Sequence, residues 1–350
     1  MHFPYQTSKI TLPIGKLPMD LLDQLLKRYS LTDDRVVVGP EVGEDAAVVD
    51  IGGPNYLIAK TDPITLTAGR IGWYAAHINA NDIATMGGLP RWFLATVLLP
   101  EAKTTPAEVE KIFQDIFDAC QGLGISLIGG HTEVTAGLTR PVIIGQMLGE
   151  VEKEKLVRTS GARVGDAIIL TKGIAVEGTA IIARERALEV ARLFGDEMLA
   201  KCRNFIYQPG ISVLKEARIA VERARVHAMH DPTEGGLATA LHEIGRAADV
   251  GIAIQADAVK VFPETRQLCD HYGIDPMGLI ASGALLISVE PDQAHSLLAA
   301  LEHEGIPASV IGKVTSKSQG FKILTSSGLQ ELPIFEPDEI VKIEDGPVRI

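Results

Sequence analysis

One acidic residue in a predicted helix constrains the fold of this chain more than any other feature. Residues 68–86 are predicted to form a helix that ends at a glycine pair. Ile71, Ala75 and Ile78 share one apolar face of this helix, and Asp82, four residues further on, falls on the same face. Its carboxylate would face the interior at the helix end where the helix dipole disfavours an anion. Such a group needs a cation or a good hydrogen-bond partner.

Two further acids lie beside predicted strands. Asp45 comes just before residues 46–51, a short valine-rich segment typical of a buried strand. Asp62 follows a second predicted strand, residues 56–60, and the ends of strands in α/β sheets often carry ligand-binding residues. Asp45, taken alone, is more typical of a turn residue.

The three acids together predict a metal-nucleotide site. If Asp45, Asp62 and Asp82 converge, each pair at ~4 Å repels by about 4 kcal/mol at an effective dielectric constant near 20. Mg²⁺ removes this penalty, and it usually binds one or two carboxylates together with phosphate oxygens and water. The interpretation therefore requires a bound nucleotide as well as the ion.

A second candidate segment, residues 230–237, begins another predicted helix. Thr233 is the predicted N-cap, and Gly235 and Gly236 lie in the first turn. Free amides and the positive helix end can bind an anion, whereas the alternative is that the glycines allow close helix packing. Asp231, just outside this end, is a further candidate for the metal or phosphate network.

Other candidates lie at two turns. Gly129 and Gly130 follow a predicted strand, residues 125–128, and would let the backbone approach a ligand closely. His131 would then be a candidate acid, base or phosphate contact, the alternative being a turn histidine. Lys16, ahead of a predicted helix, is either a phosphate contact or a solvated lysine.

Four motifs in order resemble those of the aminoimidazole-ribonucleotide (AIR) synthase superfamily. They are GEDAAV at 43–48, TD at 61–62, NDIATMGG at 81–88 and DPTEGGL at 231–237. The superfamily includes AIR synthase, selenophosphate synthetase, thiamine-monophosphate kinase and the hydrogenase maturation factor HypE. The resemblance runs from residue 15 to about residue 325, and it is closest to the HypE-like branch because of the GKLP opening at 15–18.

This resemblance implies an α/β, PurM-like fold in two domains. Residues 1–155 would form an ATP- and Mg²⁺-binding domain whose sheet builds a barrel with that of a second subunit. Residues 156–350 would form a mixed sheet covered by helices. By resemblance, the metal ligands are Asp45, Asp62, Asp82 and Asp231, the nucleotide contacts are Lys16, Gly129, Gly130, Thr233, Gly235 and Gly236, and the substrate contacts are His131 and Glu133.

The implied activity is cleavage or transfer of the γ-phosphoryl group of ATP, which activates an oxygen of a small-molecule or protein-borne substrate. Two alternatives stay open: a small-molecule kinase like thiamine-monophosphate kinase, and a non-catalytic nucleotide-binding maturation factor with a partner protein. HypE ends in a cysteine that carries the reacting group, whereas the last residue here is Ile350. We therefore expect a role in hydrogenase maturation only if a partner supplies the thiol.

Composition narrows the remaining functional classes. The 350 residues carry 33 Lys and Arg against 45 Asp and Glu, a net charge of −12, which argues against a nucleic-acid or anionic-membrane partner. The three cysteines show no CxxC spacing, and the N-terminus does not have the layout of a signal peptide. We expect a cytoplasmic protein without disulfides.

Overall fold

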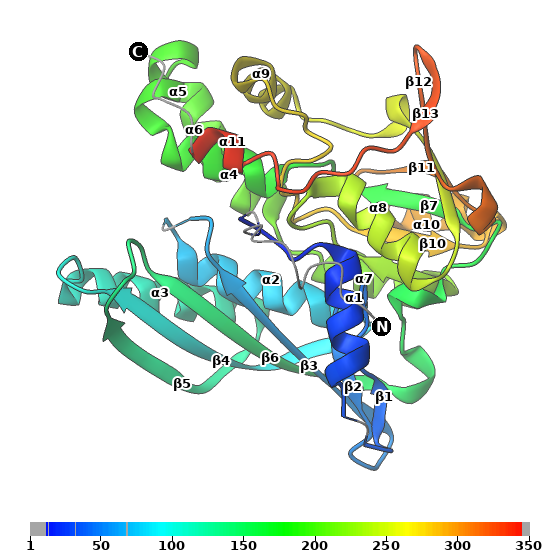
Figure 1. Cartoon of the computed structure of the whole chain (residues 1–350), viewed down its shortest axis with the longest axis horizontal. Helices are drawn as coiled ribbons and strands as arrows, with labels where there is room; N and C mark the ends of the chain where they lie inside the picture. Colours follow the sequence, from blue (N-terminus) through cyan, green and yellow to red (C-terminus); the bar gives the residue numbers. More distant parts are fainter. Residues whose placement is uncertain (1–11, 13, 32, 68, 345–350) are drawn as a thin grey trace, which may run out of the picture.

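The computed structural model describes residues 12–344 except residues 13, 32 and 68, and it is an α/β structure with two sheets (Figure 1). The first half of the chain builds one sheet and the second half builds the other, with helix α2 between them (Figure 1). Ile350, the last residue of the sequence, lies outside the described residues. No helix in the described part of the chain is both long and apolar enough to cross a membrane.

The first sheet has six strands in the order β1-β2-β3-β6-β4-β5. Its strands are β1 (Val36–Val38), β2 (Ala47–Val49), β3 (Asn55–Ile64), β4 (Leu89–Pro100), β5 (Ser126–Thr135) and β6 (Val142–Glu152). Neighbours are antiparallel except β4 and β5, which are parallel and are joined through helix α3. Helices α2 (Ile71–Thr85) and α3 (Pro106–Leu123) lie on the same face of this sheet (Figure 1).

The second sheet has seven strands in the order β13-β12-β9-β11-β7-β10-β8. They are β7 (Ala167–Thr171), β8 (Val226–His230), β9 (Gly251–Gln255), β10 (Leu286–Val289), β11 (Ala308–Thr315), β12 (Phe321–Thr325) and β13 (Gly328–Glu331). The alternating side chains of β7 separate two cores: Ile168 and Leu170 pack with helix α8, and Ile169 packs with α7 and α10. The sheet is therefore covered on both faces.

The helices of the second half complete the two-domain structure. They are α4 (Val176–Glu185), α5 (Ala187–Phe194), α6 (Asp196–Asn204), α7 (Leu214–Arg223), α8 (Gly236–Ala247), α9 (Pro263–Tyr272), α10 (Pro291–His303) and α11 (Val341–Glu344). The first helix of the described residues, α1 (Met19–Tyr29), precedes the first sheet. The non-helical backbone of Arg186 (φ −112°, ψ 32°) separates α4 from α5. The boundary between residues 155 and 156 stays a prediction.

Helix α2 is almost completely buried. All of its residues except Trp73 are buried, so it has no solvated face opposite the predicted apolar stripe. Two glycines of β6 allow its close approach: a Cβ at Gly145 would lie 2.3 Å from the Asn79 side chain, and one at Gly149 would lie 2.3 Å from that of Ile83. This packing confirms that Asp82 faces the interior.

Both ends of helix α3 are capped by residues next to them in the sequence. The Thr105 hydroxyl accepts a hydrogen bond from the Glu108 amide at 3.3 Å, and the Glu108 carboxylate accepts one from the Thr105 amide at 2.8 Å. Gly124 ends the helix in the left-handed conformation (φ 70°). These contacts span three residues, which is why the sequence alone predicts them.

The strand predicted over 125–128 was too short, because β5 continues through the glycine pair to Thr135. Gly130 has φ +147°, and a Cβ there would lie 2.0 Å from the Ala95 carbonyl oxygen. Glycine at this position therefore keeps β5 paired with β4 instead of ending the strand. His131 and Glu133 lie in the strand, not in a turn.

We predict that the three cysteines do not react in the folded protein. Cys120, Cys202 and Cys269 are buried without disulfides, and burial raises the pKa of their thiols to about 11, 12 and 12. Because the thiolate is the nucleophile, alkylation by iodoacetamide at pH 8 should be slower than in denaturant by more than ~100-fold. Mass spectrometry would count the labelled thiols, and one fast-reacting cysteine in the native protein would contradict this burial.

Candidate metal and nucleotide site

Three buried aspartates from distant parts of the chain converge. Asp45, Asp82 and Asp231 are 6%, 3% and 2% exposed, and one carboxylate oxygen of each lies within 4.8 Å of those of the other two. Four of their oxygens are buried without a hydrogen-bond partner among the described residues: Oδ2 of Asp45, Oδ2 of Asp82 and both oxygens of Asp231. Buried carboxylates without partners are costly, and oxygen ligands in this number fit a divalent cation such as Mg²⁺.

Local structure explains how these three side chains meet. Asp45 stands before β2 in a turn that needs Gly43 (φ +91°), because a Cβ there would lie 2.7 Å from the Glu243 carbonyl oxygen of α8. Asp82 comes from the buried helix α2, and Asp231 directly follows β8. The cluster thus joins the two halves of the chain.

Burial and mutual repulsion dominate the titration of the acids. Burial, the largest cause, and the neighbouring Asp45 raise the pKa of Asp231 to about 7, although His230 and Lys60 oppose them. The pKa of Asp82 is also well above its ordinary value because of burial, although Lys60 opposes this effect. Both acids carry their proton more readily than a solvated aspartate does, so the ionised cluster needs compensating charge.

His230 supplies part of that charge. Its Nδ1 lies 2.6 Å from Oδ1 of Asp45, and its Nε2 lies 2.9 Å from Oε2 of Glu243. Burial by itself would lower the pKa of this imidazole, but the two carboxylates outweigh it and hold the pKa well above the usual value. The imidazolium donates to one oxygen of Asp45 and leaves the other free.

Lys16 continues the same network toward solvent. Its Nζ lies 3.0 Å from Oε1 of Glu243 and donates to the Thr233 hydroxyl at 3.2 Å. Burial alone would raise the pKa of Glu243, but Lys16 and His230 outweigh it and lower the pKa to about 2. Glu243 therefore stays ionised and holds two cations beside the acids.

Asp62 is placed differently from the other three acids. Strand β3 pairs with β6 without interruption from Asn55 to Ile64, so Asp62 lies within the strand and not after its end. Its side chain is about one-third exposed, and Lys60 Nζ lies 3.5 Å from Asp62 Oδ2 and 3.1 Å from Asp82 Oδ1. The prediction of a strand end failed because long-range pairing with β6 extends the strand past Pro63.

A cavity of about 330 Å³ contains most of the predicted residues. Its polar lining includes Lys16, Asp45, Lys60, Asp62, Asp82, His230, Asp231, Thr233, Gly235, Glu243 and Asp338. The structure thus brings the four predicted acids together with Lys16, Thr233 and Gly235. Their roles as metal and nucleotide ligands stay predictions.

The predicted N-cap of α8 was wrong. Gly235, in the left-handed conformation (φ 84°), precedes the helix instead of Thr233. The Gly235 amide donates to Oδ2 of Asp338 at 2.6 Å, so a carboxylate from 103 residues away occupies this amide. A Cβ at Gly236 would lie 2.5 Å from the Met277 carbonyl oxygen, which supports the close-packing alternative for that glycine.

His131 and Glu133 lie outside this cavity. They project from β5, where His131 Nε2 lies 3.2 Å from Glu133 Oε2, and their side chains are 65% and 48% exposed. Gly129, Gly130 and His131 line a separate cavity beside Phe113. Within one chain these residues are not brought to the acid cluster, and their substrate role stays a prediction.

Sequence reasoning missed Lys60, Glu243 and Asp338. Lys60 left one signal, since it stands two residues before Asp62 in a strand and so shares its face. Asp338 left none, because it reaches the site from a segment far from the motifs in sequence. Glu243 lies on α8, close to the DPTEGGL motif, but its partners Lys16 and His230 are not local to it on that helix.

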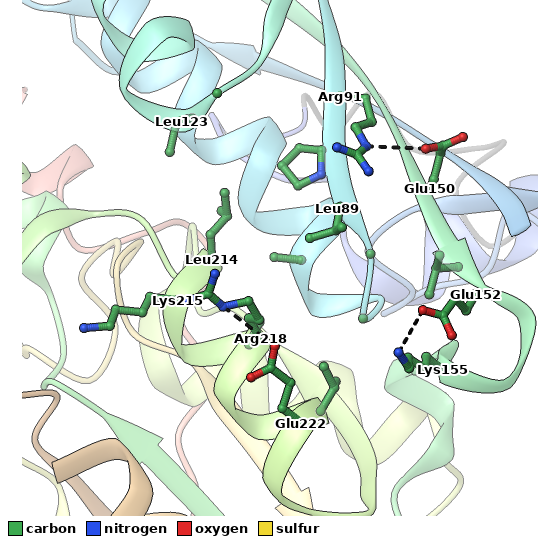
Figure 2. A pocket seen from close by; sticks show the side chains of 18 of the residues that line it. Leu89, Arg91, Leu123, Glu150, Glu152, Lys155, Leu214, Lys215, Arg218 and Glu222 are labelled. Carbon is green, nitrogen blue, oxygen red and sulfur yellow. Dashed lines mark hydrogen bonds and ion pairs between the residues drawn. The ribbon is translucent and has the colours of Figure 1, made fainter. Parts of the chain in front are cut away.

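A second cavity, of about 950 Å³, lies between α7 and the start of β4 (Figure 2). Its charged side chains are paired: Arg91 Nε lies 3.4 Å from Glu150 Oε2, and Lys155 Nζ lies 2.8 Å from Glu152 Oε1 (Figure 2). No group of acids able to hold a metal was found here among the described residues. The smaller cavity is therefore the candidate site.

Comparisons with known proteins agree with the architecture and with the motif order. Residues 43–151 match the N-terminal domain of AIR synthase related proteins, and residues 163–324 match the C-terminal domain. A putative hydrogenase expression/formation protein of Methanocaldococcus jannaschii is 29% identical over 92% of this chain and 96% of its own length. The carbamoyl dehydratase HypE of Rhizobium leguminosarum bv. viciae is 28% identical over 82% and 81%.

A crystal structure of the hydrogenase maturation protein HypE in complex with ATP is also similar. It superposes with a TM-score of 0.70 at 26% identity and covers 85% of this chain and 90% of its own. The two-domain α/β arrangement predicted from the resemblance is confirmed by this likeness.

We predict that Asp231→Asn stabilises the metal-free protein at pH 8. The folded-state pKa of Asp231, about 7, lies above that of an unfolded aspartate, about 3.9. Its contribution to stability therefore falls as pH rises from about 4 to about 7, and the penalty is complete at pH 8. With chelator present, the melting temperature of D231N should exceed that of the wild type by at least ~2 °C.

The matched control is Asp166→Asn, a buried aspartate whose carboxylate is hydrogen-bonded by His227 and Ser288. Scanning calorimetry should show D166N melting below the wild type. If D231N also melts below it in chelator, Asp231 carries no repulsive penalty.

Proposed function

The chain belongs to the AIR synthase related family, and we propose that it is an ATP- and Mg²⁺-dependent enzyme. Its reaction would cleave or transfer the γ-phosphoryl group of ATP and activate an oxygen of a small-molecule or protein-borne substrate. The observation that carries this proposal is the set of four unpartnered, buried oxygens on Asp45, Asp82 and Asp231. The ATP complex of the related HypE protein supports the choice of nucleotide.

The residues present fit a magnesium ion. Asp45, Asp82 and Asp231 would hold it through the oxygens that have no other partner. Asp62, which lines the same cavity, would be a further ligand. When bound, the ion supplies positive charge to the oxygens of the phosphoryl group being transferred.

The chain's own groups prepare the site in three ways. His230 donates to one oxygen of Asp45 and so orients the other into the cluster. Lys16, whose side chain is 44% exposed, lies at the cavity wall where its ammonium group can bind a phosphate. Burial strengthens the bond between His230 and Asp45. Positioned charges of this kind matter because catalysis of phosphoryl transfer rests mainly on positioning and charge.

The six-stranded sheet supports a homodimer. The side chains of β4 and β6 that point away from α2 are only half-buried, and most are apolar: Trp92, Leu94, Thr96 and Leu98 of β4, and Val142, Ile144, Gln146 and Leu148 of β6. Strand β5 adds an edge that has no second neighbour among the described strands, with Ile128 and Val134 more than half exposed. Such a surface favours a second copy, whose sheet would close the barrel expected from the resemblance.

We predict that Leu148→Asp dissociates this dimer. A charge in the centre of an apolar interface should cost at least ~2 kcal/mol, or about 30-fold in the dissociation constant. Sedimentation velocity would measure the change. Leu329→Asp, an exposed leucine on β13, serves as the control and should leave the dimer intact. Equal dissociation constants for L148D and the wild type would place the interface elsewhere.

Two other functions make different predictions about products. A small-molecule kinase would yield a stably phosphorylated product, whereas an activating enzyme would release phosphate and a dehydrated or cyclised product. A non-catalytic maturation factor would bind ATP without turnover and retain a partner protein. The related protein described as a hydrogenase expression/formation protein motivates this last alternative.

We predict that Asp82→Asn lowers Mg²⁺-dependent ATP turnover by more than ~100-fold, since even residues that only support a metal ligand contribute 10- to 100-fold. Asp50→Asn is the control, because Asp50 pairs with Lys153 at 2.6 Å on the surface and does not line the cavity. Release of ADP measures the rate. An Asp82→Asn protein as fast as the wild type would remove the basis for the enzymatic proposal.

A further inference from the structure

Lys60 occupies one side of the acid cluster. Its side chain, 18% exposed, extends from β3, and its Nζ lies between Oδ1 of Asp82 at 3.1 Å and Oδ2 of Asp62 at 3.5 Å. The other oxygen of Asp82 has no partner and belongs to the buried set that includes Asp231. Asp82 therefore presents one oxygen to a lysine and the other to the unfilled centre of the cluster.

The two oxygens of Asp82 therefore face two different possible cation positions. The oxygens of Asp45, Asp82 and Asp231 that come within 4.8 Å of one another define the first. The space between Asp62 and Asp82 defines the second, and two-metal sites commonly place a second ion about 3.5–4 Å from the first, bridged by a shared carboxylate. Here an ammonium group that is covalently part of the chain already lies at the second position.

We propose that Lys60 replaces a second divalent ion, so that the chain by itself holds one metal ion, at Asp45, Asp82 and Asp231. The inference rests on the proposed metal site and adds the number of metal ions that each chain binds there. An ion bridging Asp62 and Asp82 would need oxygens about 2.0–2.1 Å away if it were magnesium, and the Lys60 ammonium group excludes it from that space.

Replacing an ion by a lysine has a chemical consequence. The lysine is held in place by the strand, so its charge remains when the metal is removed, and it is a point charge suited to a phosphate oxygen. His230 cannot take this role, because both of its ring nitrogens are held, by Asp45 and by Glu243. Lys16 pairs with Glu243 and contacts neither Asp62 nor Asp82 directly, so among the described residues only Lys60 lies between these two acids. Lys60 is thus a positioning residue for Asp62 and Asp82 and a candidate phosphate contact.

The test counts Mn²⁺ ions per chain in the nucleotide-free protein, with free Mn²⁺ measured by electron paramagnetic resonance at saturation. Wild type should bind one ion. Lys60→Met keeps the length of the side chain, removes the charge and should bind two. Lys60→Arg restores the charge and should bind one. Lys153→Met, which removes a lysine paired with Asp50 outside the cavity, should also bind one.

Each other result has a distinct meaning. Two ions in the wild type, or one in a folded K60M, would overturn the replacement of a metal by Lys60 and leave the proposed function standing. No ion in the wild type would overturn the metal site of the proposed function as well.

Melting curves confirm that K60M is folded and give a second readout. Without metal, K60M should melt below the wild type, because Asp62 and Asp82 then have no cation between them. Mn²⁺ should raise the melting temperature of K60M by more than it raises that of the wild type. An equal increase in both proteins would contradict the proposal.

Discussion

The repulsion among buried carboxylates at the end of α2 is the constraint on which the rest of the structure depends. Asp82 is enclosed because α2 packs against the six-stranded sheet, where Gly145 and Gly149 leave room for it. Asp45 and Asp231 approach the same point from the two halves of the chain. A protein that buries three acids with four unpartnered oxygens requires positive charge from elsewhere.

The surrounding cations neutralise the cluster only in part. His230 and Lys60 each bind one oxygen of an aspartate and leave its second oxygen without a partner. Complete neutralisation by side chains would leave no oxygen free for a metal ion, whereas absence of these cations would increase the repulsion among the buried carboxylates. The arrangement between these limits holds the carboxylates in place and keeps ligand atoms available to a divalent ion.

The same packing relates the site to the proposed dimer. One face of the six-stranded sheet supports α2 and thereby Asp82, and the opposite face carries the half-buried apolar side chains of β4 and β6. His131 and Glu133 lie on the edge strand next to that second face, away from the acid cluster of their own chain. In the proposed dimer, the partner sheet would cover the strand that carries them.

The sequence by itself determined the features that depend on neighbouring residues. The caps of α3 and the interior position of Asp82 follow from side chains three or four positions apart. Four ordered motifs also predicted the family and the convergence of the acids.

Only the tertiary structure decided the rest, because the deciding contacts join distant segments. Pairing with β6 and β4 extended two strands through Asp62 and Gly130. Asp338 accepts a hydrogen bond from the amide of Gly235, 103 residues away, and Gly235 precedes α8 where Thr233 was expected. Lys60 acquired its place between two acids only when α2 packed against β3, since no local pattern records which helix a strand will face.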